Sequence, residues 1–117
     1  MPRHMSFSMT TEAVRRREKT VTRRLGWDFL EPGDLLWACE KCQGLKKGEK
    51  VKKLALIRVV SVKREPIWSI ENYADDCKRE GFPGHTAYDF VEMFCTANRC
   101  HEDDLCNRIE FEYKEGE

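Results

Sequence analysis

The chain has 117 residues, of which 40% are hydrophobic and 36% are charged, and its formal net charge is zero. This composition is typical of an ordinary soluble globular protein and excludes a disordered or fibrous one. The length is enough for one hydrophobic core and too short for two independent domains. The sequence has no run of about 18 apolar residues, which excludes a membrane-spanning helix.

The charges are unevenly distributed along the chain. Residues 1–64 hold 16 Lys or Arg against 7 Asp or Glu, whereas residues 65–117 hold 5 against 14. A basic half of this kind is the usual electrostatic signature of phosphate or nucleic-acid binding. The alternative is that the two halves interleave in the fold and neutralise each other locally.

The N-terminal residues show no targeting signal. Residues 1–5 are interpreted as either a disordered leader or an expression remnant, followed by a single domain over residues 6–117. The start of the chain lacks the apolar stretch of a secretory signal, so a cytoplasmic location is expected.

The first predicted elements are a strand and a short helix. Residues 6–9 alternate polar and apolar side chains, which is typical of a half-buried strand. Thr10 or Thr11 can then cap a short helix that runs to Glu18. Only Ala13 and the valine after it face inward from this helix, so we expect it to depend on docking against the rest of the fold.

The most informative segment follows this helix and reads Lys-Thr-Val-Thr-Arg-Arg, from Lys19 to Arg24. In a regular strand the side chains alternate between faces, so Lys19 and Thr22 would lie on opposite sides. They can act together only if the backbone bends between them. We therefore predict a turn out of the helix and into a short strand within this segment.

The middle of the chain reads as a turn, a strand and an exposed loop. Residues 31–34 form a turn signal with proline in its preferred second place, and a strand is predicted over residues 35–40. Residues 43–53, rich in Lys and Gly, are predicted to form an exposed hairpin or long loop. Lys46 and Lys47 in this loop are candidates for contact with a nucleic-acid backbone, and a simple solvated hairpin is the alternative.

The second half begins with the strongest predicted strand, the β-branched run over residues 54–62, which Pro66 ends. A helical pattern with Ser69 as candidate cap then extends to Gly81. A second helix is predicted over residues 86–97, because its apolar positions recur at helical spacing. Residues 107–113 alternate apolar and charged side chains, as in a strand with one wet face.

Glu80 is the second informative residue. In a continuous helix that turns about 100° per residue it falls about 20° from Tyr73, on the border of the inward stripe, whereas Asp75 and Asp76 point away. A partly buried carboxyl there suits proton transfer and requires a cationic or hydroxyl partner. The Lys19–Arg24 segment offers both. The alternative is a purely structural ion pair.

A family resemblance rests on six short blocks in a fixed order. They are Lys19–Arg24, Pro32–Asp34, Arg58–Val62, Arg79–Phe82, Phe90–Phe94 and Arg108–Phe111. This ordered set resembles an ASCH domain and is similar to the small ASCH proteins of phages and prophages. The resemblance implies an α+β chain with the PUA-like fold, a small mixed β-barrel flanked by about three helices.

The resemblance also implies a role in RNA or nucleoside chemistry. PUA-like domains commonly bind RNA, one bacterial ASCH group deacetylates N4-acetylcytidine, and another is described as a ribonuclease. The catalytic Lys, Thr and Glu of the amidohydrolase group match Lys19, Thr22 and Glu80. The remaining binding candidates, besides the two loop lysines, are Thr20, Arg23 and Arg24.

The chain differs from the amidohydrolase group in three respects. It inserts the Cys- and Lys-rich segment around residues 39–53, it has a longer second helix region, and it carries Arg23 where an apolar residue is common. A shared site position therefore need not mean a shared substrate.

The chemical role of Lys19 stays open at this stage. A lysine with a pKa near 10.4 is a poor nucleophile unless it is desolvated or lies close to cations such as Arg23 and Arg24. A tight pair with Glu80 would instead keep it charged, as an electrostatic stabiliser. Thr22 would then orient water, or attack the substrate, together with Glu80.

The six cysteines raise the question of metal binding, because a disulfide framework is not expected in the cytoplasm. Cys39 and Cys42 have the spacing of half a zinc knuckle. The other candidate ligands are irregularly spaced; they are Cys95, Cys100, His101 and Cys106. Cys39 and Cys77 are equally well explained as small core residues. We predict no metal ligand and no cofactor.

Three hypotheses follow, in order of preference. The first is an enzyme that acts on modified nucleosides or RNA, and the second is a non-catalytic RNA-binding module. The third is a zinc-stabilised interaction module, which a chelator would unfold. RNA or a modified nucleoside is the expected partner, no membrane partner is expected, and the oligomeric state stays open.

Overall fold

A computed structural model describes residues 2–42 and 45–114 and contains one five-stranded sheet. The strands are β1 (Arg3–Ser6), β2 (Val21–Arg24), β3 (Leu35–Cys39), β4 (Lys53–Pro66) and β5 (Leu105–Tyr113). Their order across the sheet is β1-β3-β4-β5-β2. β1 pairs with β3 in parallel, and the other neighbouring strands are antiparallel.

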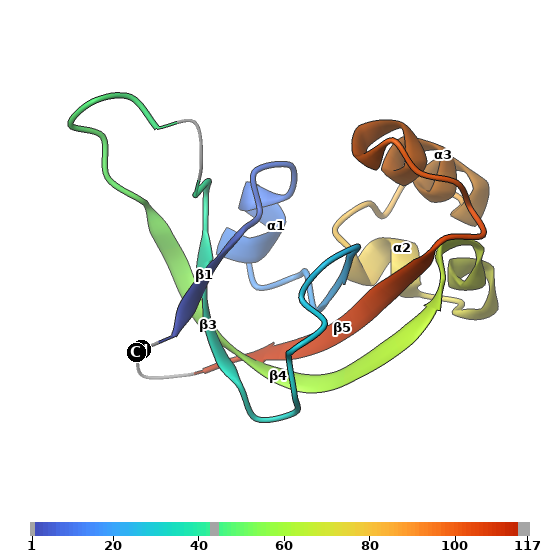
Figure 1. Ribbon diagram of the computed structural model, residues 1–117, viewed down its shortest axis with the longest axis horizontal. Helices are drawn as coiled ribbons and strands as arrows, with labels where there is room; N and C mark the ends of the chain where they lie inside the picture. The colour runs from blue at the N-terminus through green and yellow to red at the C-terminus, as the bar shows by residue number, and fades with distance from the viewer. Residues whose placement is uncertain (1, 43–44, 115–117) are drawn as a thin grey trace.

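Four helical segments accompany the sheet. They are α1 (Thr11–Arg15), the 3₁₀ helix η1 (Ile67–Asn72), α2 (Asp76–Arg79) and α3 (Ala87–Asn98). Figure 1 shows β4 and β5 as two long curved strands, with α2 and α3 on the concave side near one end. The α+β class and the small mixed barrel with flanking helices that the resemblance implied are thus confirmed, with the sheet as a curled half-barrel. None of the helices in the described ranges is long and apolar enough to cross a membrane.

The hydrophobic core lies inside the curled sheet. Its buried side chains include Met5 from β1, Leu36 from β3, Ile57 from β4 and Phe111 from β5, and Val14 of α1 closes it on the concave side. The pairing of β4 with β5 shifts register between Val59 and Ser61. Such an irregularity bends and twists a strand, which helps the long β4–β5 pair to curl.

A side chain, not a backbone ladder, spans the gap between the two edge strands. β1 and β2 are the ends of the sheet order. Arg24 at the end of β2 donates from Nη2 to the carbonyl oxygen of Ser6 in β1 at 2.7 Å. The barrel is therefore half open along this seam, and Arg24 lies across it.

The N-terminal elements differ from the sequence predictions. The first strand lies at Arg3–Ser6 and not at residues 6–9, because parallel pairing with β3 places Met5 fully inside the core. Residues 3–5, assigned above to a leader, thus belong to the sheet. Met1, residues 43–44 and residues 115–117, which the domain assignment also covered, lie outside the described residues. α1 ends at Arg15, three residues earlier than predicted, although Ala13 and Val14 are buried as expected.

The predicted helix from Ser69 to Gly81 is wrong as a single element. It divides into η1 and α2, with Tyr73 in an extended conformation between them. The break changes which side chains face inward, so Asp76 is buried together with Glu80. The prediction that Asp76 points outward is wrong, because it assumed one continuous helix through residues 69–81.

The remaining elements lie close to their predictions. α3 begins after a capping box formed by Thr86 and Asp89 and ends before Arg99, which adopts a left-handed conformation. Its Phe90 and Phe94 pack on a second buried cluster with Ile67 and its neighbours. β5 starts two residues early, and its Arg108 is buried, so its predicted wet face is wrong at this position.

The inward face of β3 also differs from the simple alternation of its sequence. Leu36 and Ala38 are buried, as alternation predicts for one face of the strand. Cys39 is also buried, although alternation would place it on the other face with the more exposed Leu35 and Trp37. The register shift between Ala38 and Cys39 explains this, because it interrupts the alternation of faces.

Candidate functional site

The segment before β2 bends as the sequence predicted. The Lys19 backbone N–H donates to the carbonyl oxygen of Ala13 at 3.3 Å, and the Thr20 N–H donates to that of Arg79 at 2.8 Å. The strand begins only at Val21. Lys19 therefore lies outside the strand alternation, and its side chain can reach the same region as that of Thr22.

Gly81 helps to bring Glu80 to this region. Gly81 ends α2 with a positive φ of 99°, a conformation that favours glycine. A Cβ atom at this position would lie 3.1 Å from side-chain atoms of Thr10 and Ala13, so α1 packs directly against the glycine. The close approach carries the preceding residue, Glu80, toward Lys19.

Lys19 and Glu80 form a buried ion pair. The Lys19 Nζ atom lies 2.9 Å from Oε1 of Glu80 and also donates to the Glu80 carbonyl oxygen at 2.5 Å. Both side chains are 3% exposed. Burial lowers the pKa of Lys19 below 10.5, Glu80 opposes this effect, and the charges of Arg24 and Arg23 add to it. The lysine is thus more easily deprotonated than a free one.

Thr22 lies beside this pair and contacts Arg24. The Arg24 Nε atom donates to Oγ1 of Thr22 at 3.0 Å, while the guanidinium lies 4.9 Å from the ring centre of Phe7. Burial lowers the pKa of Arg24, and the charge of Glu80 opposes that effect. No ion pair joins Arg24 to a carboxylate within residues 2–42 and 45–114. Its charge is therefore available to an anionic ligand.

These side chains line one pocket of about 300 Å³. Lys19, Thr22 and Glu80 are among its polar lining residues, together with Arg23, Arg24 and Asn98. Its apolar wall is mainly aromatic and includes Phe7, Phe82, Phe90, Met93 and Phe94. The volume is at the lower end of the range for small-molecule sites. An aromatic wall with a few polar groups suits a flat, polar molecule such as a nucleobase.

Arg23 lies deeper and joins Glu80 to a second carboxylate. Its Nη1 atom donates to Oε2 of Glu80 at 3.0 Å, and its Nη2 atom donates to Oδ2 of Asp76 at 2.5 Å. Arg108 of β5 adds a two-point contact to Asp76, at 2.9 and 3.0 Å. Glu65, 3.7 Å from Arg23, completes the set, so the buried cluster holds three cations and three carboxylates.

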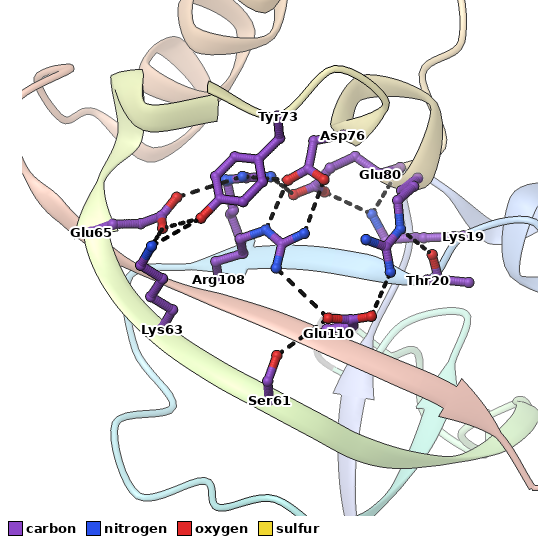
Figure 2. A network of polar contacts seen from close by, with 12 residues as sticks. Lys19, Thr20, Ser61, Lys63, Glu65, Tyr73, Asp76, Glu80, Arg108 and Glu110 are labelled. Atoms are coloured by element: carbon purple, nitrogen blue, oxygen red, sulfur yellow. Dashed lines mark hydrogen bonds and ion pairs between the residues drawn. The ribbon is translucent and has the colours of Figure 1, made fainter. Parts of the chain in front are cut away.

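Figure 2 shows this network between the sheet and α2, with Asp76 facing Arg108 and Glu80 facing Lys19. Around it, the Tyr73 hydroxyl donates to Glu65 at 2.7 Å. The basic and acidic halves of the chain thus interleave in the interior, as the local-neutralisation alternative proposed. Asp76, Glu65 and Arg108 had no role in the sequence predictions. The only sequence signal of Asp76 and Arg108 was charge at positions that an unbroken helix or an alternating strand would expose.

The other predicted binding residues do not face the pocket with free polar groups. The Thr20 hydroxyl accepts a hydrogen bond from Nε of Arg79 at 3.0 Å. Arg23 lines the pocket, but carboxylates hold its guanidinium. Lys46 and Lys47 are exposed in the β3–β4 loop and do not line this pocket. Figure 1 shows that this loop projects away from α2 and α3.

The cysteines give no metal cluster in the part of the chain that the structure describes. No group of three or more His, Cys, Asp or Glu side chains there could hold a metal ion. Burial raises the pKa of the Cys39 thiol to about 12, and the nearby Cys42 adds to this effect. Gly44, the last residue of the knuckle-like segment, lies outside the described residues.

Comparisons with known proteins show a likeness at the level of the fold. No family model matches the sequence, and no curated protein matches it. Protein EF3133 from Enterococcus faecalis V583, of family DUF984, is 17% identical, with a TM-score of 0.61 over 97% of this chain and 76% of that one.

Two further structures cover nearly the whole chain. The hypothetical protein PH0355 has a TM-score of 0.62 at 13% identity and covers 97% of both chains. An ASCH domain from Lactobacillus crispatus JV V101 has a TM-score of 0.56 at 16% identity, over 95% of this chain and 78% of that one. The curled half-barrel, its flanking helices and these matches together establish that the chain has an ASCH-type, PUA-like fold.

Proposed function

We propose that this protein acts on RNA or on a modified nucleoside, and that it hydrolyses an amide of the N4-acetylcytidine type in the pocket lined by Lys19, Thr22 and Glu80. One observation carries the proposal. The three residues that match the catalytic set of ASCH amidohydrolases come from two distant segments, Lys19 and Thr22 from one and Glu80 from the other, and they line a single aromatic-walled pocket. The lowered pKa of Lys19 adds chemical support.

The proposed reaction consumes one water molecule. Water adds to the acetyl carbon, the carbon–nitrogen bond to N4 of the base breaks, and cytidine and acetate are released. Lys19, as a neutral amine, accepts a proton from the attacking water, and the proton then passes to the departing N4. The Thr22 hydroxyl, which accepts a hydrogen bond from Arg24, stabilises negative charge on the acetyl oxygen.

The Thr22 hydroxyl provides the most specific test of this site. Thr22→Val keeps the shape of the side chain and removes only the hydroxyl. We expect it to lower kcat/KM for N4-acetylcytidine by about 100-fold, measured by release of cytidine. Thr20→Val is the matched control and should keep wild-type turnover, because the Thr20 hydroxyl contacts Arg79 and does not line the pocket. Equal rates for both variants, or no wild-type turnover, would contradict the proposal.

The pH dependence of the reaction reports the protonation state of Lys19. If its neutral amine is the base, kcat/KM should rise with pH and level off above an apparent pKa that lies below 10.5, because burial lowers the pKa of this lysine. The measurement is kcat/KM for N4-acetylcytidine across the alkaline range. A fall in kcat/KM over the same range would instead assign Lys19 the role of a charged stabiliser.

A second candidate function is a non-catalytic RNA-binding module. The observation that favours it is the completeness of the Lys19–Glu80 pair, since both groups are 3% exposed and each has more than one partner, as in a structural ion pair. The protein should then bind RNA without turnover, and log Kd should increase linearly with the logarithm of the salt concentration. A short RNA, tested both for cleavage and for salt-dependent binding, separates this module from a ribonuclease. Binding that does not change with salt would count against both.

A further inference from the structure

A second, more open hollow adjoins the pocket. It has a volume of about 700 Å³, and Arg23, Arg24 and Asn98 line both spaces. The two hollows therefore lie next to each other, at the seam where Arg24 joins β2 to β1. The outer part is lined mainly by residues to which the sequence predictions assigned no binding role.

The outer hollow is basic. Arg3 and His4 of β1 line it together with Arg24, and none of its lining residues in the described ranges is a carboxylate. Arg3 is exposed, and the Arg24 hydrogen bonds given above go to a hydroxyl and a carbonyl oxygen, so the Arg24 guanidinium has no ion-pair partner among the described residues. Guanidinium groups bind phosphate through paired hydrogen bonds, and a partly buried one gains most from an anion.

The same hollow has an aromatic wall. The ring centres of Trp27 and Phe29 are 5.5 Å apart, and Phe29 is 54% exposed although it is large and apolar. The Arg3 guanidinium lies 4.5 Å from the ring centre of Phe29. A base stacked on an aromatic side chain strengthens binding by about 10-fold.

The aromatic wall is held in place from behind. Trp27 has a positive φ of 70°, which is unfavourable for a bulky residue. Asn107 of β5 donates to the Gly26 carbonyl oxygen at 2.7 Å and to Asp28 at 2.6 Å, on either side of Trp27. Two anchored neighbours therefore keep the strained residue in its position before any ligand arrives.

We propose that this outer hollow binds the phosphate and the base of the nucleotide next to the one in the Lys19 pocket, so that the ligand is an RNA strand and not a free nucleoside. The phosphate lies between Arg3 and Arg24, and the neighbouring base stacks on Trp27 and Phe29. This inference rests on the proposed function, because it assumes that the inner pocket takes a nucleoside.

Calorimetric titration with cytidine, cytidine 5′-monophosphate and the dinucleotides CpA and ApC tests the inference. We expect at least one dinucleotide to bind about 10-fold more tightly than cytidine, since one stacked base contributes on this scale. Arg3→Gln and Trp27→Leu should remove this gain and change the affinity for cytidine by less than about twofold. Trp68→Leu is the matched control, because Trp68 is a partly exposed tryptophan outside both hollows.

Each outcome separates the inference from the proposed function. If cytidine binds and neither dinucleotide binds more tightly, the outer subsite is refuted and the inner pocket stands. If no ligand binds, both are refuted. A gain from the monophosphate as large as that from the dinucleotides would overturn the stacking of a second base. Because Trp27 also packs against the barrel core, Arg3→Gln decides the matter if Trp27→Leu does not fold.

Discussion

Asp76→Asn is expected to lower the free energy of unfolding by about 3–5 kcal/mol, because it leaves two buried guanidinium groups without their shared countercharge. Asp76 is 2% exposed and receives hydrogen bonds from both Arg23 and Arg108. Asparagine keeps the shape of the side chain but not its charge. Chemical denaturation at neutral pH, with matched slopes, measures the loss.

Asp75→Asn is the matched control for this change. Asp75 is the exposed neighbour at the start of α2, and its side chain makes no capping hydrogen bond. The control should change stability by less than about 0.5 kcal/mol. A loss below about 1 kcal/mol in Asp76→Asn would mean that the network tolerates an unpaired cation, contrary to the energetics of buried charge.

The advantage of wild type over Asp76→Asn should shrink in acid. Burial raises the pKa of Asp76, but the hydrogen bonds and charges of Arg108 and Arg23 outweigh this effect and lower it below 3.8. A carboxyl with a depressed folded-state pKa stabilises the fold fully above its unfolded-state value, and this contribution disappears as the pH falls through the folded-state value. The difference between the two proteins should therefore be constant near neutral pH and narrow below 3.8.

A double-mutant cycle on Lys19 and Glu80 is expected to separate structure from catalysis. Lys19→Met and Glu80→Gln each remove one charge of a buried pair, and each should cost about 3 kcal/mol or more of unfolding free energy. The loss of unfolding free energy in the double variant should be smaller than the sum of the two single losses by at least about 1 kcal/mol. In each single variant one charge of the pair stays buried without the other, whereas the double variant removes both charges. Turnover should fall by about 100-fold or more in all three variants, since the proton carrier is absent or altered.

Stability and activity thus respond differently in this cycle. Lys78→Met, an exposed change on α2, is the control for loss of a lysine and should affect neither property. The relevant measurements are unfolding free energies by denaturant and kcat/KM for N4-acetylcytidine. A folded double variant with wild-type turnover would show that the ion pair is structural, and the catalytic proposal would then be wrong.

Local patterns were sufficient for much of the fold. The apolar run at residues 54–62 lies within β4, and the helical spacing of residues 86–97 matches α3 to within one residue. The bend after Lys19 also followed from the sequence, because alternation of side chains is a local rule. Signals of this kind depend on neighbours within a few residues, which a single sequence displays directly.

Tertiary structure decided what lies inside the site. Asp76 and Arg108 are 32 residues apart and Lys19 and Glu80 are 61 apart, so no local period relates their side chains. The break between η1 and α2 changed the facing of Asp76, and parallel pairing with β3 moved the first strand to Arg3–Ser6.

The sequence by itself therefore determined the order and type of most elements and the residues Lys19, Thr22 and Glu80 as a candidate set. Only the tertiary structure decided that Arg23, Asp76 and Arg108 join Lys19, Glu80 and Glu65 in a buried cluster of three cations and three carboxylates, and that Arg24 spans an open seam. The physical reason is that charged side chains are buried only where distant partners compensate them, and a linear sequence does not display those partners.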